Sequence, residues 1–336
     1  MNSTATLALP AALASEGMPW GIGWLQRILE SAGVTSDWIP WEAVWLVQFF
    51  LLVCLAFHLL ERKGPRIFPE RRPGPFHHGW RADLAATILH GPVLSGLLEI
   101  AAVGLLLWIP ALAAPGMASW PWAVQFLIFF LAIDFLRYWL HRWHHASPFL
   151  WRLHRVHHSA EEMTFFTSSR FHLGEALLVY VALPLPFKLA GLSPSVLMVY
   201  AALDLAKGFW QHANWRNSIG VANLFISSAE QHWWHHARDG EGMNANFGSF
   251  LSIWDRMFGT FYWRPGQWPR QVGIDGVTHF PRSYLGRFLS AWRSNDEFRS
   301  PDQPAARAES SKGVNVSAPY EDSGRAAHED IEARAV

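Results

Sequence analysis

Three short stretches of the chain repeat one spacing of histidines, and these residues are the ones best suited to chemistry. Within each stretch the histidines stand at positions i, i+3 and i+4, which share one face of an α-helix. We therefore expect each trio to aim its imidazoles at one point. The trios are His141, His144 and His145; His154, His157 and His158; and His232, His235 and His236.

The number of these imidazoles predicts two bound metal ions. Neutral imidazole is the commonest side-chain metal ligand, and an ion such as zinc takes only about four ligands. Iron, copper, zinc and nickel all suit imidazole, so the spacing leaves the metal open. Binding of lipid headgroups is the alternative for the trios, because arginines lie among them. An isolated histidine is more often a packing residue, as we expect for His58, His77, His78, His90, His279 and His328.

The elements that position the trios are apolar enough to lie in a membrane. Hydrophobic residues make up 51% of the chain and charged residues 16%, with 20 Trp and 23 Phe, whereas soluble domains have about 25% charged residues. Segments of about 20 apolar residues can cross ~30 Å of hydrocarbon. About four to five such helices are expected, from the segments 41–60, 84–114, 122–140, 173–190 and 193–210. Pro148 is expected to separate the helices that carry the first two trios.

Charge and cysteine content exclude several classes of protein. Lys+Arg and Asp+Glu balance at 27 each, so no basic field exists to bind nucleic acid. The single cysteine, Cys54, rules out a disulfide framework and an iron–sulfur cluster. Six basic residues between 62 and 81 predict a cytoplasmic loop, because such residues favour the cytoplasmic side. Counting spans from there places every histidine trio on the cytoplasmic face.

Three regions follow from these patterns. Residues 1–40 form an N-terminal extension, in which 19–34 has apolar spacing typical of an interfacial helix. Residues 41–293 form the membrane-embedded domain, with histidine boxes at 141–145, 154–158 and 232–236. Residues 294–336 are polar without apolar periodicity, which predicts a disordered tail.

Seven motifs occur in an order that resembles the sterol desaturase and fatty acid hydroxylase superfamily. The resemblance covers residues 132–263 and implies an all-helical integral membrane protein with a cytosolic helical cap. It also implies a non-haem centre of two iron ions that uses O₂ to hydroxylate or desaturate a lipid. The motifs are DFLRYWLHR, HRWHH, HRVHHSAEEM, SSRFH, WQHANW, QHWWHH and NANFGSFLSIWDRMFGTFY.

The resemblance also implies which residues bind the metals. His144 is extra to the usual first box and is the weaker candidate. Leu173 stands where the family often has proline, and Ala213 where it commonly has serine. The implied ligands are His141, His145, His154, His157, His158, His212, His232, His235 and His236.

Ligand histidines usually donate their other ring N–H to a carboxylate or a carbonyl. Asp134, His172 and Asp255 are the candidates we favour to support the centre in this way, His172 by the resemblance. Further carboxylate candidates are Asp204, Glu175 and Glu230. The structural alternatives are ion pairs of Asp134 with Arg137 and of Asp204 with Lys207.

Electrons must reach such a centre from a separate ferredoxin- or cytochrome-type donor, because the chain has no fused haem-domain signature and no cysteine set for a cluster. The other expected partners are the membrane and the lipid substrate. A di-zinc membrane hydrolase, a membrane cytochrome and a non-catalytic membrane metal-binding protein remain alternatives. The sequence leaves open which lipid is the substrate.

Overall fold

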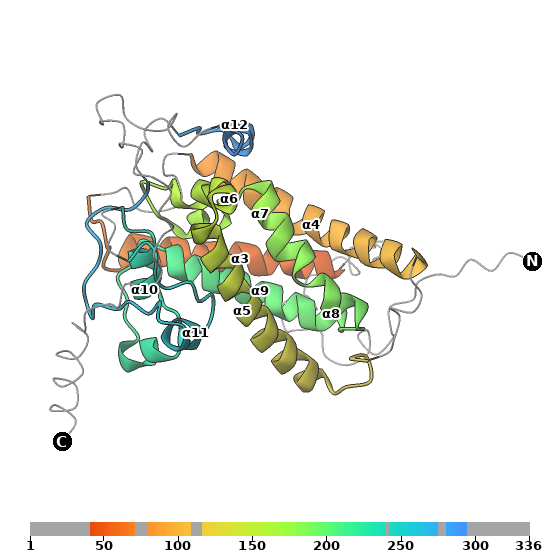
Figure 1. Ribbon diagram of the computed structural model, residues 1–336. Helices are drawn as coiled ribbons and strands as arrows, with labels where there is room; N and C mark the ends of the chain where they lie inside the picture. The colour runs from red at the N-terminus through yellow and green to blue at the C-terminus, as the bar shows by residue number, and fades with distance from the viewer. Residues whose placement is uncertain (1–40, 71–78, 109–115, 239–241, 275–279, 294–336) are drawn as a thin grey trace, which may run out of the picture. The chain divides into compact units, whose positions relative to one another are not determined.

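The computed structural model describes residues 41–70, 79–108, 116–238, 242–274 and 280–293 of the chain (Figure 1). These residues form helices and connecting loops without a strand; Ile226 with Leu251, and Ala237 with Val272, form isolated β-bridges. The all-helical prediction is confirmed for this part. The predicted extension 1–40 and tail 294–336 lie outside the described residues. The elements are α3 (Trp41–Lys63), α4 (Trp80–Trp108), α5 (Trp122–Ala146), α6 (Pro148–His158), η2 (Phe165–Ser169), α7 (Leu173–Leu177), η3 (Leu178–Ala182), α8 (Leu185–Leu189), α9 (Pro194–His212), η4 (Gly220–Leu224), α10 (Ala229–His235), α11 (Ile253–Met257) and α12 (Tyr284–Ser290).

Four long helices coincide with predicted membrane segments. Helices α3, α4, α5 and α9 contain 23, 29, 25 and 19 residues. Among the described residues, α5 alone combines the length and the apolar composition that a membrane crossing requires. The expected four to five spans therefore stay a prediction.

The apolar segment 173–190 is divided rather than forming one straight helix. It consists of α7, the five-residue π-helix η3 and α8, which begins after Pro184. Proline interrupts a helix because it lacks an N–H group and its ring clashes with the preceding turn. Gly191 then reverses the chain with a φ of 84°, and an added Cβ would lie 3.3 Å from the backbone nitrogen of Ala118. Glycine thus fits both the turn and the close approach.

The break at Pro148 occurs as predicted. Helix α5 ends at Ala146, and the Ser147 hydroxyl caps α6 by accepting from the backbone N–H of Leu150 at 3.4 Å. Proline suits the first position of a helix, where its missing N–H costs nothing. Helices α5 and α6 pack against each other, so the first two histidine trios lie on adjacent helices.

The charged side chains between α5 and α9 form neither of the two ion pairs that the sequence offered, Asp134 with Arg137 and Asp204 with Lys207. Arg137 donates to Asp204 and, at 3.0 Å, to the hydroxyl of Tyr200. Lys207 donates to the carbonyl of Ser227. The predicted partners were neighbours on one helix, whereas packing of α5 against α9 offers Arg137 a carboxylate on the facing helix.

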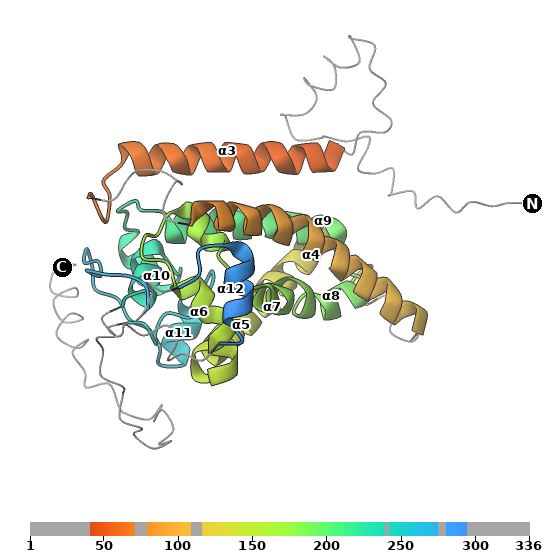
Figure 2. The same ribbon diagram turned by 90° about the horizontal axis from the view of Figure 1, so that it is seen from above.

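Figures 1 and 2 both place α6 and α10 at the end of the bundle where α5 and α9 terminate. Helix α10 contacts α9, and α6 contacts α5. The helices that carry the histidines therefore converge in one region, built from parts of the chain about 100 residues apart.

Candidate metal centre

Nine histidines gather in two groups whose ring nitrogens could each hold an ion. Within a group, all of the ligand atoms lie within 4.8 Å of one another. The first group contains His141, His145, His154, His158 and His235. The second contains His157, His212, His232 and His236. Together they are the nine histidines that the sequence singled out.

The trios do not each aim at one point, so that expectation is wrong. In each trio the histidines at i and i+4 belong to the same group, while the one at i+3 is separated from them. An α-helix turns by about 100° per residue, so positions i and i+4 point within about 40° of each other, while i+3 and i+4 diverge by about 100°. His157 therefore leaves its trio for the second group, and His235 leaves its own for the first.

The spacing of the nitrogens suits metal coordination. In the first group the Nε2 atoms of His141 and His154 are 3.0 Å apart, and those of His154 and His158 are 3.1 Å apart. In the second group, the Nε2 atoms of His212 and His232 are 2.9 Å apart. Two nitrogens bonded to one ion at about 2.1 Å lie about 3 Å apart when the angle between the bonds is near 90°.

The hydrogen bonds of the rings define which nitrogens carry lone pairs. The Nδ1 atoms donate to acceptors outside the groups: His141 to the carbonyl of Phe247 at 3.0 Å, and His154 to Glu175 Oε1 at 2.7 Å. In the same way, His235 donates to the carbonyl of Ala245 at 2.7 Å. A neutral imidazole that donates from Nδ1 has an unprotonated Nε2. The Nε2 atoms of His141 and His154 therefore face each other with lone pairs, a contact that a cation between them would stabilise.

The electrostatic environment keeps the imidazoles neutral. Burial, and secondarily the neighbouring histidines, hold the pKa of His158 and of His236 well below the ordinary value. Burial lowers the pKa of His235 to about 4, against the effect of its bond to the Ala245 carbonyl. Neutral imidazole is the form that binds metal. The residues present therefore fit a pair of metal ions.

Among the described residues, Glu175 is the carboxylate that forms a hydrogen bond with a ligand histidine. It is 2% exposed, and its second oxygen, Oε2, has no hydrogen-bond partner among the described residues. His144 lies beside this pair, with its ring stacked on His154 at 5.1 Å and its Nε2 equally unpartnered. His144 thus sits against the first group rather than within it. The sequence identified Glu175 as one of several carboxylates without distinguishing it.

Asp134 and Asp255 support the centre through the backbone of the loop 246–260. Asp134 accepts from the backbone N–H of Phe250 at 2.8 Å and from Trp254 Nε1 at 2.9 Å. Asp255 accepts from the backbone N–H of Phe247 at 2.7 Å, and the carbonyl of Phe247 accepts from His141. Burial raises the pKa of Asp255 to about 7, although its hydrogen bonds oppose the shift. Neither aspartate bonds to a ligand histidine in the described part of the chain.

His172 occupies a capping position outside both groups. Its Nδ1 accepts from the backbone N–H of Gly174 at 2.9 Å at the start of α7, and its Nε2 donates to the carbonyl of Phe288 at 2.9 Å. The other acceptors that orient ligand histidines are backbone carbonyls. The sequence could not reveal them, because every residue has a carbonyl. Only the glycine-containing stretch NANFG hints at a backbone that approaches the histidines closely.

The comparisons with known proteins agree with this geometry. The sequence model of the fatty acid hydroxylase family matches residues 126–260, a range that contains all nine candidate ligands. This part of the chain is therefore similar to the fatty acid hydroxylase family, as the order of the motifs predicts.

Lipid-modifying enzymes of several kinds are similar to the chain. An ornithine lipid hydroxylase of Rhizobium tropici is 27% identical over 261 residues, which cover 73% of this chain and 76% of the relative. An alkylglycerol monooxygenase of Danio rerio is 33% identical over 45% of this chain, and a Delta(7)-sterol 5(6)-desaturase of Gibberella zeae is 33% identical over 46% of it. The chain spans only 32% and 42% of the lengths of those two proteins. No solved structure matches the chain.

Proposed function

We propose that the protein is a membrane-bound, non-haem di-iron oxygenase that hydroxylates a lipid, with desaturation as the closely related alternative. Its similarity to the fatty acid hydroxylase family and to lipid hydroxylase, monooxygenase and sterol desaturase relatives supports a lipid oxidoreductase. We favour hydroxylation because the ornithine lipid hydroxylase matches 73% of this chain over 76% of its own length.

The two groups of histidines, in which Nε2 atoms face one another, carry this proposal. Five imidazoles in one group and four in the other can hold two ions without a carboxylate in either group. Bound iron would supply the activation of O₂ and the oxidation of an unactivated C–H bond. The contribution of the chain is to keep the imidazoles neutral, oriented and enclosed.

The acceptors behind the rings perform the orientation. Carbonyls of Phe247, Ala245 and Gly208 fix the Nδ1 protons of three ligand histidines, and Glu175 fixes a fourth. The buried ring of Phe247 packs against His145 at 5.2 Å and so excludes water from one side of the first group. Partners that hold the outer nitrogen of a ligand histidine raise its basicity and fix its direction.

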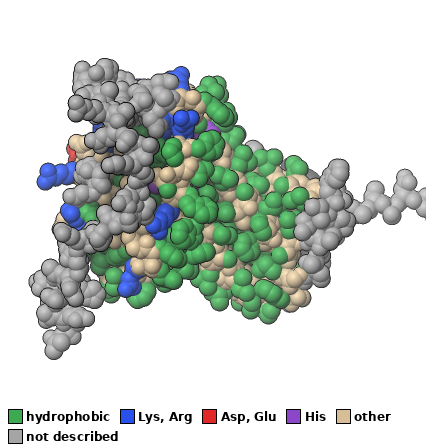
Figure 3. Space-filling view, viewed as in Figure 1, with side chains coloured by type: hydrophobic (Ala, Val, Ile, Leu, Met, Phe, Trp, Pro, Cys, Tyr) green, Lys and Arg blue, Asp and Glu red, His purple; other side chains and the backbone are tan. Residues whose placement is uncertain are grey.

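The surface of the helices suits a lipid environment. Figure 3 shows hydrophobic side chains covering the region over α4, α5, α7 and α8, whereas lysines and arginines gather at the other end of this face. On α5, Leu127 and Leu131 are 57% and 41% exposed, and Ile100 on α4 is 69% exposed. Large contiguous apolar surfaces mark membrane or protein contacts. We infer a multi-pass membrane protein whose histidine centre lies at the cytoplasmic end of the helices.

The reaction also requires an electron donor. Insertion of one oxygen atom of O₂ into a C–H bond releases the other as water and consumes two electrons and two protons. A separate ferredoxin- or cytochrome-type protein is the donor that we propose.

Metal analysis and product formation by the purified protein test the function. We expect about two irons per chain, as nine imidazoles exceed what one ion takes, and a hydroxylated lipid that depends on O₂ and reductant. His157→Ala should abolish product and lower the iron content, while the protein still inserts in membranes. His58→Ala is the matched control, because His58 belongs to neither group. Product formed under strict anaerobiosis, or two zinc ions with hydrolytic activity, would instead establish the hydrolase.

A further inference from the structure

The outer face of α12 is apolar and exposed, although α12 lies outside the five segments that the sequence assigns to the membrane. Leu285, Leu289 and Trp292 recur at helical spacing and are 64%, 47% and 74% exposed. Large apolar side chains that gather on one exposed face mark a contact with a membrane or with another protein. The other face of α12, its direction and its surroundings distinguish between these two.

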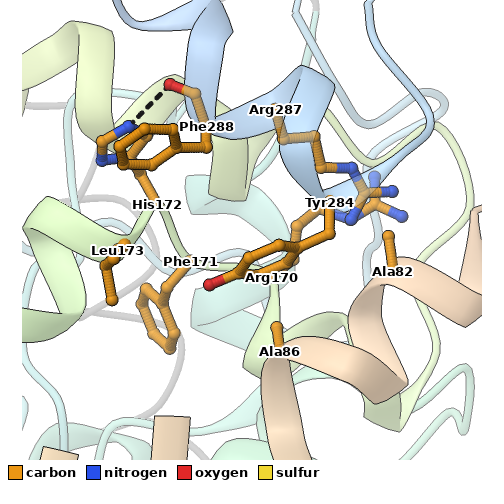
Figure 4. A pocket seen from close by; sticks show the side chains of 9 residues that line it. All are labelled: Ala82, Ala86, Arg170, Phe171, His172, Leu173, Tyr284, Arg287 and Phe288. Atoms are coloured by element: carbon orange, nitrogen blue, oxygen red, sulfur yellow. Dashed lines mark hydrogen bonds between the residues drawn. The ribbon is translucent and has the colours of Figure 1, made fainter. Parts of the chain in front are cut away.

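The inner face of α12 is held against the rest of the protein, as Figure 4 shows. Arg287 forms an ion pair with Asp83 of α4, which is fully buried. The ring of Phe288 stacks on that of His172 with centroids 5.1 Å apart, and Nε2 of His172 donates to the Phe288 carbonyl at 2.9 Å. These contacts define the rotation of α12 about its own axis, so its apolar face points outward.

Helix α12 runs across the direction of the long helices. Figure 1 looks along the axis of α12, whereas α3, α4 and α9 extend across the picture. Figure 2 shows α12 lengthwise, and there too it crosses the direction of α3. If the long helices cross a bilayer, α12 therefore lies close to the plane of that bilayer, the orientation of an interfacial helix.

Contacts with α4 define the level of α12 along the long helices. The Tyr284 hydroxyl and Nε2 of His90 are within hydrogen-bond distance, 3.1 Å apart. Ile88 and Leu89, which precede His90 on α4, are 57% and 44% exposed. They are the first exposed apolar residues of α4, because the exposed residue of its first turns is Arg81. Helix α12 thus meets α4 where the apolar surface of α4 begins.

The residues at this level are typical of a membrane interface. Arg81 and Arg282 are exposed, the first near the start of α4 and the second just before α12. The guanidinium of Arg81 lies over the ring of Trp80, 5.7 Å from its centroid. Asp83 is the one acidic residue within 79–90 and 280–293, and it is buried. Tryptophan and tyrosine concentrate at the headgroup level of bilayers, and arginine suits phosphate groups.

Helix α12 is also linked to the metal centre. Arg155 lies on α6 between His154 and His157, and it donates to the carbonyls of Ser290 and Arg293 at the end of α12. Its side chain is buried. The helix that carries three candidate ligands is therefore fixed to α12, and the two must keep the same position relative to a membrane.

We propose that α12 lies flat in the headgroup region of a phospholipid bilayer, with its apolar face toward the acyl chains and Arg282 at the lipid phosphates. Through Arg155, the helix holds the histidine centre at a fixed distance from the membrane surface. The proposal rests on the proposed function for the membrane location of the long helices, and it is independent of metal binding and turnover.

Spin labels on single cysteines test this position in phosphatidylcholine vesicles, with Cys54→Ser as the background. Leu289→Cys reports on α12, and Leu131→Cys on the exposed apolar face of α5. Arg270→Cys is the aqueous control, because Arg270 is exposed in the loop that follows α10. Power saturation measures collisions of each label with O₂, which concentrates in lipid, and with a water-soluble nickel complex. We expect mainly oxygen collisions at 289 and 131, and mainly nickel collisions at 270.

A charge on the apolar face provides a second measurement. Leu285→Glu should shift a label at Trp292→Cys from oxygen toward nickel collisions, because the carboxylate disfavours burial in lipid. Leu285→Met is the matched control, since it keeps the face apolar, and should leave the label unchanged. An equal response to both substitutions would overturn the proposal.

The outcomes separate this proposal from the proposed function. Nickel collisions at 289 with oxygen collisions at 131 would overturn the position of α12 and leave the membrane-bound oxygenase standing. Few collisions with either reagent at 289 would show that protein covers the face, which would exclude the bilayer as its partner. Nickel collisions at 131 would overturn the membrane location and the proposal for α12 with it. Oxygen collisions at 289 in a protein that forms no O₂-dependent product would support α12 and overturn the oxygenase.

Discussion

Replacement of Glu175 should weaken one metal site and spare the other. Glu175 Oε1 accepts from His154 Nδ1 at 2.7 Å, and both side chains are buried. His154 belongs to the first group, so the second group lacks this contact. Glu175→Ala therefore removes the acceptor from one ligand only and leaves a buried N–H group without a partner.

The expected size of the effect follows from that single bond. A hydrogen bond to a charged group contributes about 1.5–3 kcal/mol, and about 1.36 kcal/mol corresponds to a factor of ten. One ion should therefore bind about 10–150-fold more weakly. Glu175→Gln should have a smaller effect, because its amide oxygen can still accept while the negative charge is lost.

Chelator competition on the purified protein measures this difference. The wild type should release two ions at similar chelator concentrations, and Glu175→Ala should release one much earlier than the other. Glu61→Gln is the matched control, because Glu61 is equally buried but accepts from the backbone of Phe165 and Asn214 instead of from a histidine. Equal weakening of both ions in Glu175→Ala, or the same biphasic release from Glu61→Gln, would show that the carboxylate acts on the fold as a whole.

Three further outcomes are expected. Because burial gives Asp255 a pKa of about 7 in the folded state, against an ordinary value of 3.8, the folded protein binds more protons than the unfolded one between these pH values. The protonated Asp255 carboxyl thus stabilises the folded state below pH ~4, and this contribution of about 4 kcal/mol at most is lost as the pH rises to ~7. The thermal midpoint of Asp255→Asn should therefore vary less over this pH range than that of the wild type. An equal variation would refute the pKa shift. Reporter fusions at Gly74 and Asp239, both outside the described residues, should each report the cytoplasm, and opposite sides would mean that the span count is wrong. Truncation after Arg299 should preserve membrane insertion and iron content, whereas loss of iron would make the tail structural.

The sequence by itself singled out the nine histidines that form the candidate metal centre. Imidazole chemistry and the repeated i, i+3, i+4 spacing are local properties, and a resemblance of ordered motifs added His212 between the second and third boxes. Helix boundaries were also accessible, because Pro148 and Gly191 act on the backbone where they stand. Residue type and short-range spacing were sufficient for the trios and for these helix boundaries, whereas His212 required the resemblance.

Only the tertiary structure decided how those residues are shared and supported. The separation of His157 from His154 and His158, and of His235 from its neighbours, depends on how α6 faces α10. This packing brings together residues such as His157 and His236, which are 79 positions apart. The choice of Glu175 over Asp134 and Asp255 as the partner of a ligand histidine depends on which helix packs against α6. The ion pair of Asp83 with Arg287 likewise joins residues that are 204 positions apart. Such contacts arise from packing between elements, and the spacing of residues within one element carries no information about them.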